Sequence, residues 1–183
     1  MADATELIVE FVNTNDIEGG RDALGTPDLL RSWLTDRGLM GPGTQIDAGG
    51  HARAIAVREG VRALARANNE EPLDEGAVRR MNEAAGHAPL TVAIRPGAGE
   101  TEWRLTPAAT GVDGFIGLLM DAVATSMANG TWSRLKACRN DTCRWLFYDR
   151  SRNRSGTWCT MAVCGSRIKA RAYRARQREA TQA

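Results

Sequence analysis

The sequence predicts a mainly α protein. A helical N-terminal domain with one β-hairpin is expected over residues 1–130, followed over residues 134–180 by a small treble-clef-like four-cysteine zinc module ending in a basic helix. Apolar residues recur at helical spacing in the first part, and all four cysteines fall in the last 46 residues. Residues 1–133 carry 11 basic and 19 acidic side chains, whereas residues 134–183 carry 13 and 3. A basic end on an acidic body is typical of a nucleic-acid-binding segment, unless those cations pair with the body.

Two helices are expected before residue 40. Apolar residues between Leu7 and Val12 repeat at helical spacing and form one face. The tripeptide Thr26-Pro27-Asp28 predicts the start of the second helix, with threonine as N-cap, proline at the first helical position and an acid beside the positive end of the helix dipole. Leu29–Leu34 supplies the apolar stripe of this helix, and Gly38 offers its stop.

A loop over residues 41–50 precedes a longer helix from about Ala52 to Ala67. The loop lacks the Gly-Lys-Ser/Thr ending of a phosphate-binding loop, so it is interpreted as a linker. Within the helix, Arg58, Arg62 and Arg66 repeat every four residues. We expect them to form an exposed, solvated stripe rather than a ligand site.

Three further elements complete the first part. Asp74 can cap a helix that ends at Gly86. A period of two over residues 90–94 and 102–105, around the turn at residues 96–99, predicts a β-hairpin. The last helix spans Phe115 to Met127, and we expect Leu30, Trp33, Val61 and Phe115 to be buried. The chain shows no catalytic constellation or dinucleotide fingerprint, so it is not expected to be an enzyme.

The four cysteines predict one structural Zn²⁺ ion. Cys138 and Cys143 form a Cys-x4-Cys pair, Cys159 and Cys164 form a second, and 15 residues separate the pairs. Each pair can reach a tetrahedral ion from one turn, and four thiolates leave no position for a catalytic water. Two disulfides or unmetallated redox thiols are the alternatives to this zinc site.

The cellular setting favours the metal. The segment Met1–Glu6 has neither the basic nor the apolar region of a signal peptide, and no run of about 18 apolar residues spans a membrane. A cytoplasmic location is therefore expected, where reduced thiols bind metal more readily than they form disulfides. His51 and His87 lie far upstream in separate segments, so we interpret them as ordinary residues rather than ligands.

The zinc module predicts a nucleic-acid interface. We expect a tight turn from Cys138 to Cys143, a strand over residues 144–148, a basic turn over residues 149–156 and a terminal helix opened by Cys164. The apolar stripe Ile168, Ala172 and Ala175 is expected to pack on the module. The candidate phosphate-binding residues are Arg150, Arg152 and Arg154 in the turn, the helix face Arg167, Arg171, Arg174 and Arg178, and a second edge of Lys169 and Arg176. A merely solvated basic tail is the alternative.

Two strings of residues resemble a known family. Cys143-Arg-x-Leu-Phe-x-Asp-x-Ser-Arg-Asn153 and Trp158-Cys-Thr-Met-x-x-Cys164-Gly-Ser-Arg167 strongly resemble the CGNR zinc finger. The name-giving Cys-Gly-Asn-Arg has Ser166 in place of asparagine. Phe11-Val-Asn-Thr14, Asp22-x-Leu24 and Leu30-x-x-Trp33-Leu34 resemble the opening of the ABATE domain that precedes the finger in that family.

The resemblance implies a bacterial, stress-induced regulator of transcription. Two hypotheses follow for the partners. In the first, the finger binds DNA while the acidic N-terminal domain forms a homodimer, senses a small-molecule ligand or contacts other proteins. In the second, the zinc is purely architectural, and the basic helix binds RNA or an acidic protein. Sequence alone does not separate side chains that contact bases from those that contact phosphates.

Overall fold

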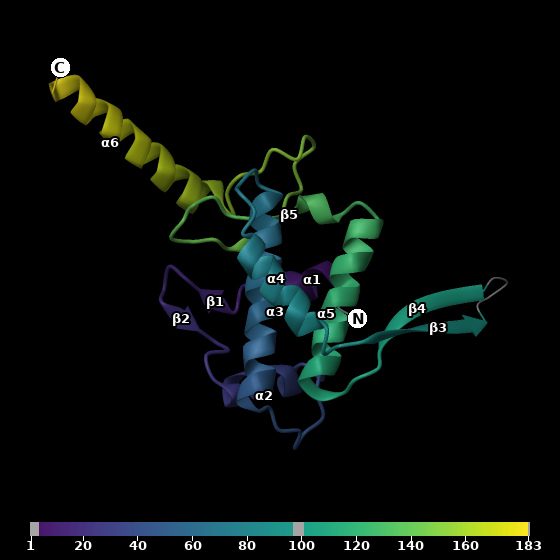
Figure 1. Ribbon diagram of the computed structural model, residues 1–183. Helices are drawn as coiled ribbons and strands as arrows, with labels where there is room; N and C mark the ends of the chain where they lie inside the picture. Colours follow the sequence, from purple (N-terminus) through teal and green to yellow (C-terminus); the bar gives the residue numbers. More distant parts are fainter. Residues whose placement is uncertain (1–3, 97–100, 183) are drawn as a thin grey trace.

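The computed structural model describes residues 4–96 and 101–182 of the 183-residue chain. About half of the chain is helical, as predicted, and α3 lies at the centre of the body while α6 extends away from it (Figure 1). The helices are α1 (Ala4–Val12), α2 (Pro27–Asp36), α3 (Ala48–Ala67), α4 (Glu75–Ala85), α5 (Gly111–Ala128) and α6 (Ser166–Gln182).

Three helices of the body begin at side-chain caps. The Thr26 hydroxyl accepts a hydrogen bond from the Leu29 amide at 3.3 Å, and the Asp74 carboxylate accepts one from the Ala77 amide at 2.9 Å. Both caps were predicted. At α3 the prediction was four residues too short, because Asp47 caps the Gly50 amide at 2.6 Å and the helix begins at Ala48. Cap chemistry outweighs the low helix propensity of the glycine pair that follows.

The described chain forms three antiparallel hairpins rather than the single one predicted. They are β1–β2 (Asn15–Asp16, Arg21–Asp22), β3–β4 (Leu90–Pro96, Thr101–Pro107) and β5–β6 (Leu135–Ala137, Leu146–Tyr148). The predicted hairpin is β3–β4, although most of its turn lies outside the described residues. Strand β6 lies within the strand predicted over residues 144–148. Strands β1, β2 and β5 have two or three residues, which are too few to show an alternating pattern.

An aromatic cluster lies at the centre of the core. Phe11, Trp33 and Phe115 approach one another with ring centroids 5.0–6.0 Å apart. Leu30, Val61 and Phe115 are buried as expected, but Trp33 is only partly buried. The outer face of its ring is covered by the Arg37 guanidinium, 4.1 Å from the ring centroid. This cation–π contact lets a large ring close the core at its edge.

The expectation of an exposed arginine stripe on α3 is wrong. Arg58 and Arg62 are only 2% and 3% exposed, and Arg66 is partly buried against Glu71. Arg58 donates two hydrogen bonds of 2.7 Å to the Asp22 carboxylate, and Glu59 bridges Arg58 and Arg62 at 2.9 Å. The acid partners lie on another element or beside the arginines on α3, so four-residue spacing alone did not reveal them.

These ion pairs lower the pKa values of the carboxylates that form them. The pKa of Asp22 lies below its ordinary value because Arg58 donates hydrogen bonds to it. Burial disfavours the charged form of Glu59, but Arg62 and Arg58 outweigh that effect and lower its pKa. Both acids are therefore held ionised, and they supply the negative charge that the buried Arg58 and Arg62 require.

One apolar core crosses the boundary between the two predicted parts. Leu135, Ala137 and Leu146, from the β5–β6 hairpin, are buried in the same cluster as the core of the helical body. The division at residue 130 stays a prediction about folding, since shared packing does not by itself say which part folds alone. Helix α5 has the length and apolar composition to cross a membrane, but Phe115, Ile116 and other side chains of this helix build the core.

Candidate metal centre and nucleic-acid interface

The four predicted zinc ligands come together. The sulfur atoms of Cys138, Cys143, Cys159 and Cys164 all lie within 4.8 Å of one another, and Cys159 Sγ lies 3.7 Å from both Cys143 Sγ and Cys164 Sγ. A disulfide would need about 2.05 Å, and all four residues are free cysteines. Tetrahedral Zn–S bonds of about 2.3 Å place sulfurs roughly 3.8 Å apart, so the cluster has the dimensions of a zinc site.

The first cysteine pair lies in the loop that connects β5 to β6. The Cys138 amide donates to the Trp145 carbonyl at 2.9 Å, which closes the turn. Inside it, the Asn140 carbonyl accepts from the amides of Cys143 at 2.8 Å and Arg144 at 3.0 Å. Arg144 has φ +52°, a left-handed conformation that lets the chain return toward β6.

In the second pair, Cys159 precedes a short π-helical turn, η2 (Met161–Gly165), and Cys164 lies within this turn. The Gly165 amide donates to the Thr160 carbonyl at 3.2 Å. A Cβ on Gly165 would lie 2.3 Å from the Met161 sulfur and 3.1 Å from the Trp158 ring, so glycine permits this tight packing. Helix α6 begins at Ser166, two residues after the predicted start, and the Ser166 hydroxyl donates to the Met161 carbonyl at 3.1 Å. Serine therefore holds the end of the turn where the family motif has asparagine.

The chemistry of the cluster fits a dication. Burial raises the pKa of Cys143 to about 11 and that of Cys159 further still, so without a cation these thiols resist ionisation. Burial also opposes ionisation of Cys164, but hydrogen bonds, first that from Asn140, lower its pKa. The Asn140 amide is 1% exposed and lies 3.6 Å from Cys164 Sγ, as expected of a group that orients a metal ligand. A metal ion supplies the positive charge that four clustered thiolates need.

A buried ion pair holds the basic loop that follows β6. Lys136 Nζ lies 2.9 Å from the Asp149 carboxylate, which also accepts from the amides of Ser151 at 2.9 Å and Gly156 at 2.8 Å. Lys136 further donates to the carbonyls of Arg154 and Gly156. These contacts lower the pKa of Asp149 well below its ordinary range, although burial opposes the shift. The loop is thus shaped by Asp149, whose carboxylate pairs with Lys136.

Four polar side chains of the helical body form hydrogen bonds with backbone groups of the module, and the sequence did not predict these contacts. The Asn13 amide pairs with both backbone groups of Leu146, accepting from its N–H at 2.7 Å and donating to its C=O at 2.9 Å. Arg62 donates to the carbonyls of Val12 and Arg144. Asn68 donates hydrogen bonds to the carbonyls of Trp132 and Leu135. Asn69 donates to the carbonyls of Ala137 and Thr157. The Asn68-Asn69 pair at the end of α3 was the one available signal, and it looked like an ordinary helix end.

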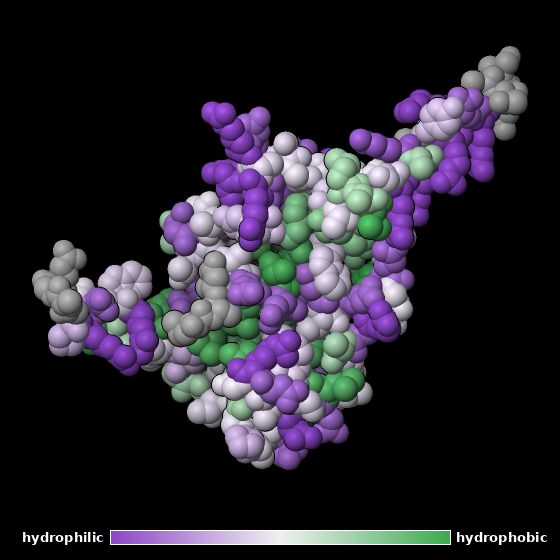
Figure 2. Space-filling model, turned by 180° about the vertical axis from the view of Figure 1, so that it is seen from behind, coloured by the Kyte–Doolittle hydropathy of each residue, from purple (hydrophilic) through white to green (hydrophobic). Residues whose placement is uncertain are grey.

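The basic residues of α6 lie on a helix that leaves the body. Figure 2 shows hydrophilic side chains along most of this helix. The prediction that its apolar stripe packs on the module is wrong at Ala175, which is exposed, whereas Ile168 is partly buried. The side chain of Ala172 lies outside the described residues. Arg167 forms an ion pair with Glu18 in the turn between β1 and β2. Among the side chains that the structure describes, no other basic residue of α6 has an acidic partner within salt-bridge distance.

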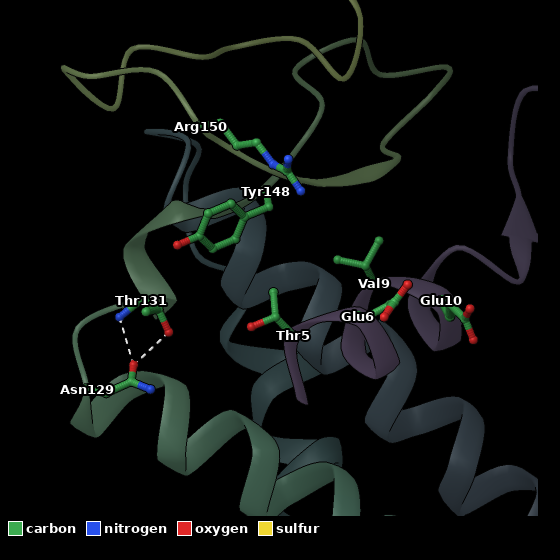
Figure 3. Close-up of a pocket in the computed structure, with 8 residues that line it drawn as sticks. All are labelled: Thr5, Glu6, Val9, Glu10, Asn129, Thr131, Tyr148 and Arg150. Atoms are coloured by element: carbon green, nitrogen blue, oxygen red, sulfur yellow. Dashed lines mark hydrogen bonds between the residues drawn. The ribbon is translucent and has the colours of Figure 1, made fainter. Parts of the chain in front are cut away.

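The three arginines of the basic loop have surroundings different from those of the α6 residues. Arg150 and Arg152 are exposed, and Arg154 is exposed but donates to the Ser133 hydroxyl at 2.9 Å. Figure 3 shows Arg150 above α1, where it lines a cavity of about 790 Å³. The residues around this cavity are Thr5, Glu6, Val9, Glu10, Asn129, Thr131, Tyr148 and Arg150. They belong to both predicted parts of the chain.

A second cavity of about 490 Å³ adjoins the cysteine cluster. Trp145, Phe147 and Val163 supply apolar walls beside Cys143, Cys159 and Cys164, and Asp16 and Glu18 lie at its edge. Trp145 and Val163 are also partly open to solvent. The apolar wall next to the sulfurs limits the access of water to the cluster.

Clustered thiols in two turns, a basic helix after the second turn and a helical body define a zinc-finger protein. Residues 5–130 match the ABATE family, described as a putative stress-induced transcription regulator, and residues 134–177 match the CGNR zinc finger. The chain belongs to the ABATE family and carries a CGNR zinc finger, as the sequence motifs suggested. This match and the four-cysteine cluster together support one structural zinc ion per chain. No curated protein matches the chain.

Proposed function

We propose that this protein is a regulator of transcription that binds DNA through α6 and the basic loop of its zinc finger. The observation that carries the proposal is the position of α6, which extends into solvent with its cations exposed (Figure 1). Helical geometry places Arg167, Arg171, Arg174 and Arg178 on one side, and Lys169 and Arg176 on roughly the opposite side.

Cations on two opposite sides of a helix suit a groove with a phosphate backbone on each wall. The major groove of DNA is about 12 Å wide, which admits one helix of about 10–12 Å diameter. A helix of 17 residues is about 25 Å long, which is enough to lie along one segment of the groove. The loop residues Arg150, Arg152 and Arg154 would contact phosphates outside it.

The zinc ion has an architectural role in this proposal. Cys138, Cys143, Cys159 and Cys164 are its four ligands, and the ion joins the β5–β6 turn to the turn that precedes α6, in a treble-clef-like arrangement. The direction in which α6 leaves the body is then fixed by the metal and by the bonds from α1 and α3 to the β5–β6 region. The protein has no catalytic role and acts in the cytoplasm.

The cavity of Figure 3 is where a small-molecule ligand would act. Arg150 reaches it from the zinc module, opposite Glu6 and Glu10 of α1. This lining suits a small molecule with both an anionic and a cationic group. Binding there would withdraw Arg150 from phosphate, which would link a signal to the finger.

RNA or an acidic protein is the alternative partner, since an arginine helix also binds those. DNA binding can be tested by fluorescence anisotropy, with a labelled DNA duplex of random sequence titrated over a range of salt concentrations. If all four residues of the Arg167–Arg178 face bind phosphates, the plot of log K against log salt should have a slope of about −3 to −4.

The double variant Arg171→Ala/Arg174→Ala should reduce that slope by about 2. A matched control, Arg79→Ala/Arg80→Ala, removes two exposed cations from α4 and should leave the slope unchanged. An unchanged slope in the α6 variant, or displacement by RNA at far lower concentration than by DNA, would favour the alternative.

A further inference from the structure

The β3–β4 hairpin carries an apolar face whose large side chains are mostly exposed over its outer half. The hairpin leaves the side of the body formed by α5 and projects into solvent (Figure 1). Val92, Ile94 and Trp103 are 64%, 70% and 71% exposed, the largest values among the exposed large hydrophobic residues of the described chain. Exposure of this kind on neighbouring residues indicates an interaction surface.

The strand register shows that these side chains share one face. Val92 pairs with Leu105 and Ile94 pairs with Trp103, and directly opposed residues of an antiparallel ladder point the same way. At the base of this face, Leu90 and Pro107 lie against Gly117 of α5, where a Cβ would meet them at 3.3 Å. The apolar face therefore begins in the core of the monomer and continues outward beyond it.

The opposite face of the hairpin is polar. The Thr91 and Thr106 hydroxyls lie 3.1 Å apart, Ala93 opposes Arg104, and Arg95 opposes Glu102. Apolar and polar residues alternate between the two faces over seven paired positions. This alternation is typical of a sheet with one face in solvent and the other face covered. An isolated two-stranded hairpin is marginally stable in water, so the outer half of this one gains from a cover.

We propose that the apolar face of the β3–β4 hairpin is the interface between two copies of this chain. The face has no charged side chain, so it suits an equally apolar and uncharged surface, and the same face of a second copy meets that requirement. Pairing of identical patches around a two-fold axis is the usual form of a homodimer.

The buried area agrees with a dimer. Val92, Ile94 and Trp103 expose roughly 350–400 Å² of apolar surface per copy. Two copies would cover about 700–800 Å² with these side chains alone, before Leu105 and the strand backbones are added. Specific interfaces begin near 1,200 Å² in total, so the hairpins supply most of a modest interface. If the proposed DNA binding holds, the dimer presents two basic helices; the dimer itself does not depend on it.

Sedimentation equilibrium of the full-length, zinc-loaded protein tests the interface. The wild-type chain should form a dimer at micromolar concentration. Ile94→Asp places a charge on the apolar face and should raise the dimer dissociation constant at least about 100-fold. The matched control Ala93→Asp places the same carboxylate on the opposite face, across from Arg104, and should remain dimeric.

Trp103→Gln provides a second variant, should Ile94→Asp fail to retain zinc and helical circular dichroism. A monomeric wild-type chain at about 100 μM would overturn the proposal. Dimerisation that survives both apolar-face variants would overturn it too, by placing the interface elsewhere. The proposal would also be overturned if the protein stayed monomeric and co-floated with phosphatidylcholine–phosphatidylglycerol vesicles in a way that Trp103→Gln abolished. The apolar face would then bind lipid rather than a second copy.

Discussion

Helices α3 and α6 both carry arginines at four-residue spacing, and the structure gives them opposite environments. On α3, Arg58 and Arg62 are buried and paired with Asp22 and Glu59. On α6, Arg171, Arg174 and Arg178 are exposed. Among the described side chains of this helix, only Arg167 has an acidic partner. The difference lies in the acids that other elements bring to each helix. An arginine row therefore leaves cations available to a partner only where the fold supplies no anion.

The largest test of this comparison removes the metal. Cys159→Ser should abolish stoichiometric zinc and melt α6, because a structural zinc site contributes on the order of 10 kcal/mol and an isolated 17-residue helix is marginal in water. Circular dichroism should lose about a fifth of its helical signal, the share of α6, while α3 keeps its ion pairs.

Elemental analysis of protein purified under reducing conditions measures the zinc. Thr160→Ser, at the exposed neighbouring position, is the matched control and should keep one ion per chain. Full zinc occupancy in the cysteine variant would show that the four thiols do not act together. Loss of all helical signal would instead show that the body depends on the finger.

The next test compares single arginines in the two helices. Arg62→Met should destabilise the protein by about 3–5 kcal/mol, because it leaves Glu59 partly unpaired and removes the bonds to Val12 and Arg144. Arg171→Met, the same change at an exposed site, should stay within about 0.5 kcal/mol. Urea denaturation of the zinc-loaded proteins gives both values, and equal losses would contradict the contrast between the helices.

Local signals in the sequence were sufficient for much of the fold. Thr26 and Asp74 revealed helix starts because their cap bonds reach only three residues. The cysteine pairs revealed a metal site for a similar reason, since the spacing within each pair fits one turn. The strand predicted over residues 144–148 contains β6, whereas the short strands β1, β2 and β5 gave no such signal.

Contacts between distant segments were not predictable in this way. Asn13 and Leu146 are 133 positions apart, and the amide looks like any polar residue after a helix. Arg58 resembled a solvated residue because Asp22, 36 positions away, reaches it only in the folded chain. The candidate DNA contacts on α6 follow from the sequence, whereas the exposure of Ala175, on the predicted packing face, needed the structure.

Acid should weaken the α3 network by protonating its carboxylates. The pKa values of Asp22 and Glu59 lie below their ordinary values of 3.8 and 4.5 in the folded chain, so their contribution to stability is complete above those values. That contribution is lost as pH falls from about 4.5 through the lower folded values. The free energy of unfolding should therefore decrease over this window.

Urea titrations at a series of pH values measure the slope. Asp22→Asn and Glu59→Gln should flatten it, whereas Asp36→Asn, at an exposed site on α2, should not. A slope that the two network variants leave intact would assign the acid sensitivity to other carboxylates.

The smallest expected effect concerns the one described ion pair that α6 makes with the body. Glu18 holds Arg167, and both side chains are about half exposed, so the pair contributes at most about 1 kcal/mol. A phosphate must compete with Glu18 for this guanidinium. Glu18→Gln should therefore raise affinity for duplex DNA by up to about 5-fold. Glu10→Gln removes an equal charge from α1 and serves as the control for general electrostatics. The gain should vanish in an Arg167→Ala background, because no arginine is then released. An equal gain in both backgrounds would mean that Glu18 acts through the net charge of the body rather than by occupying Arg167.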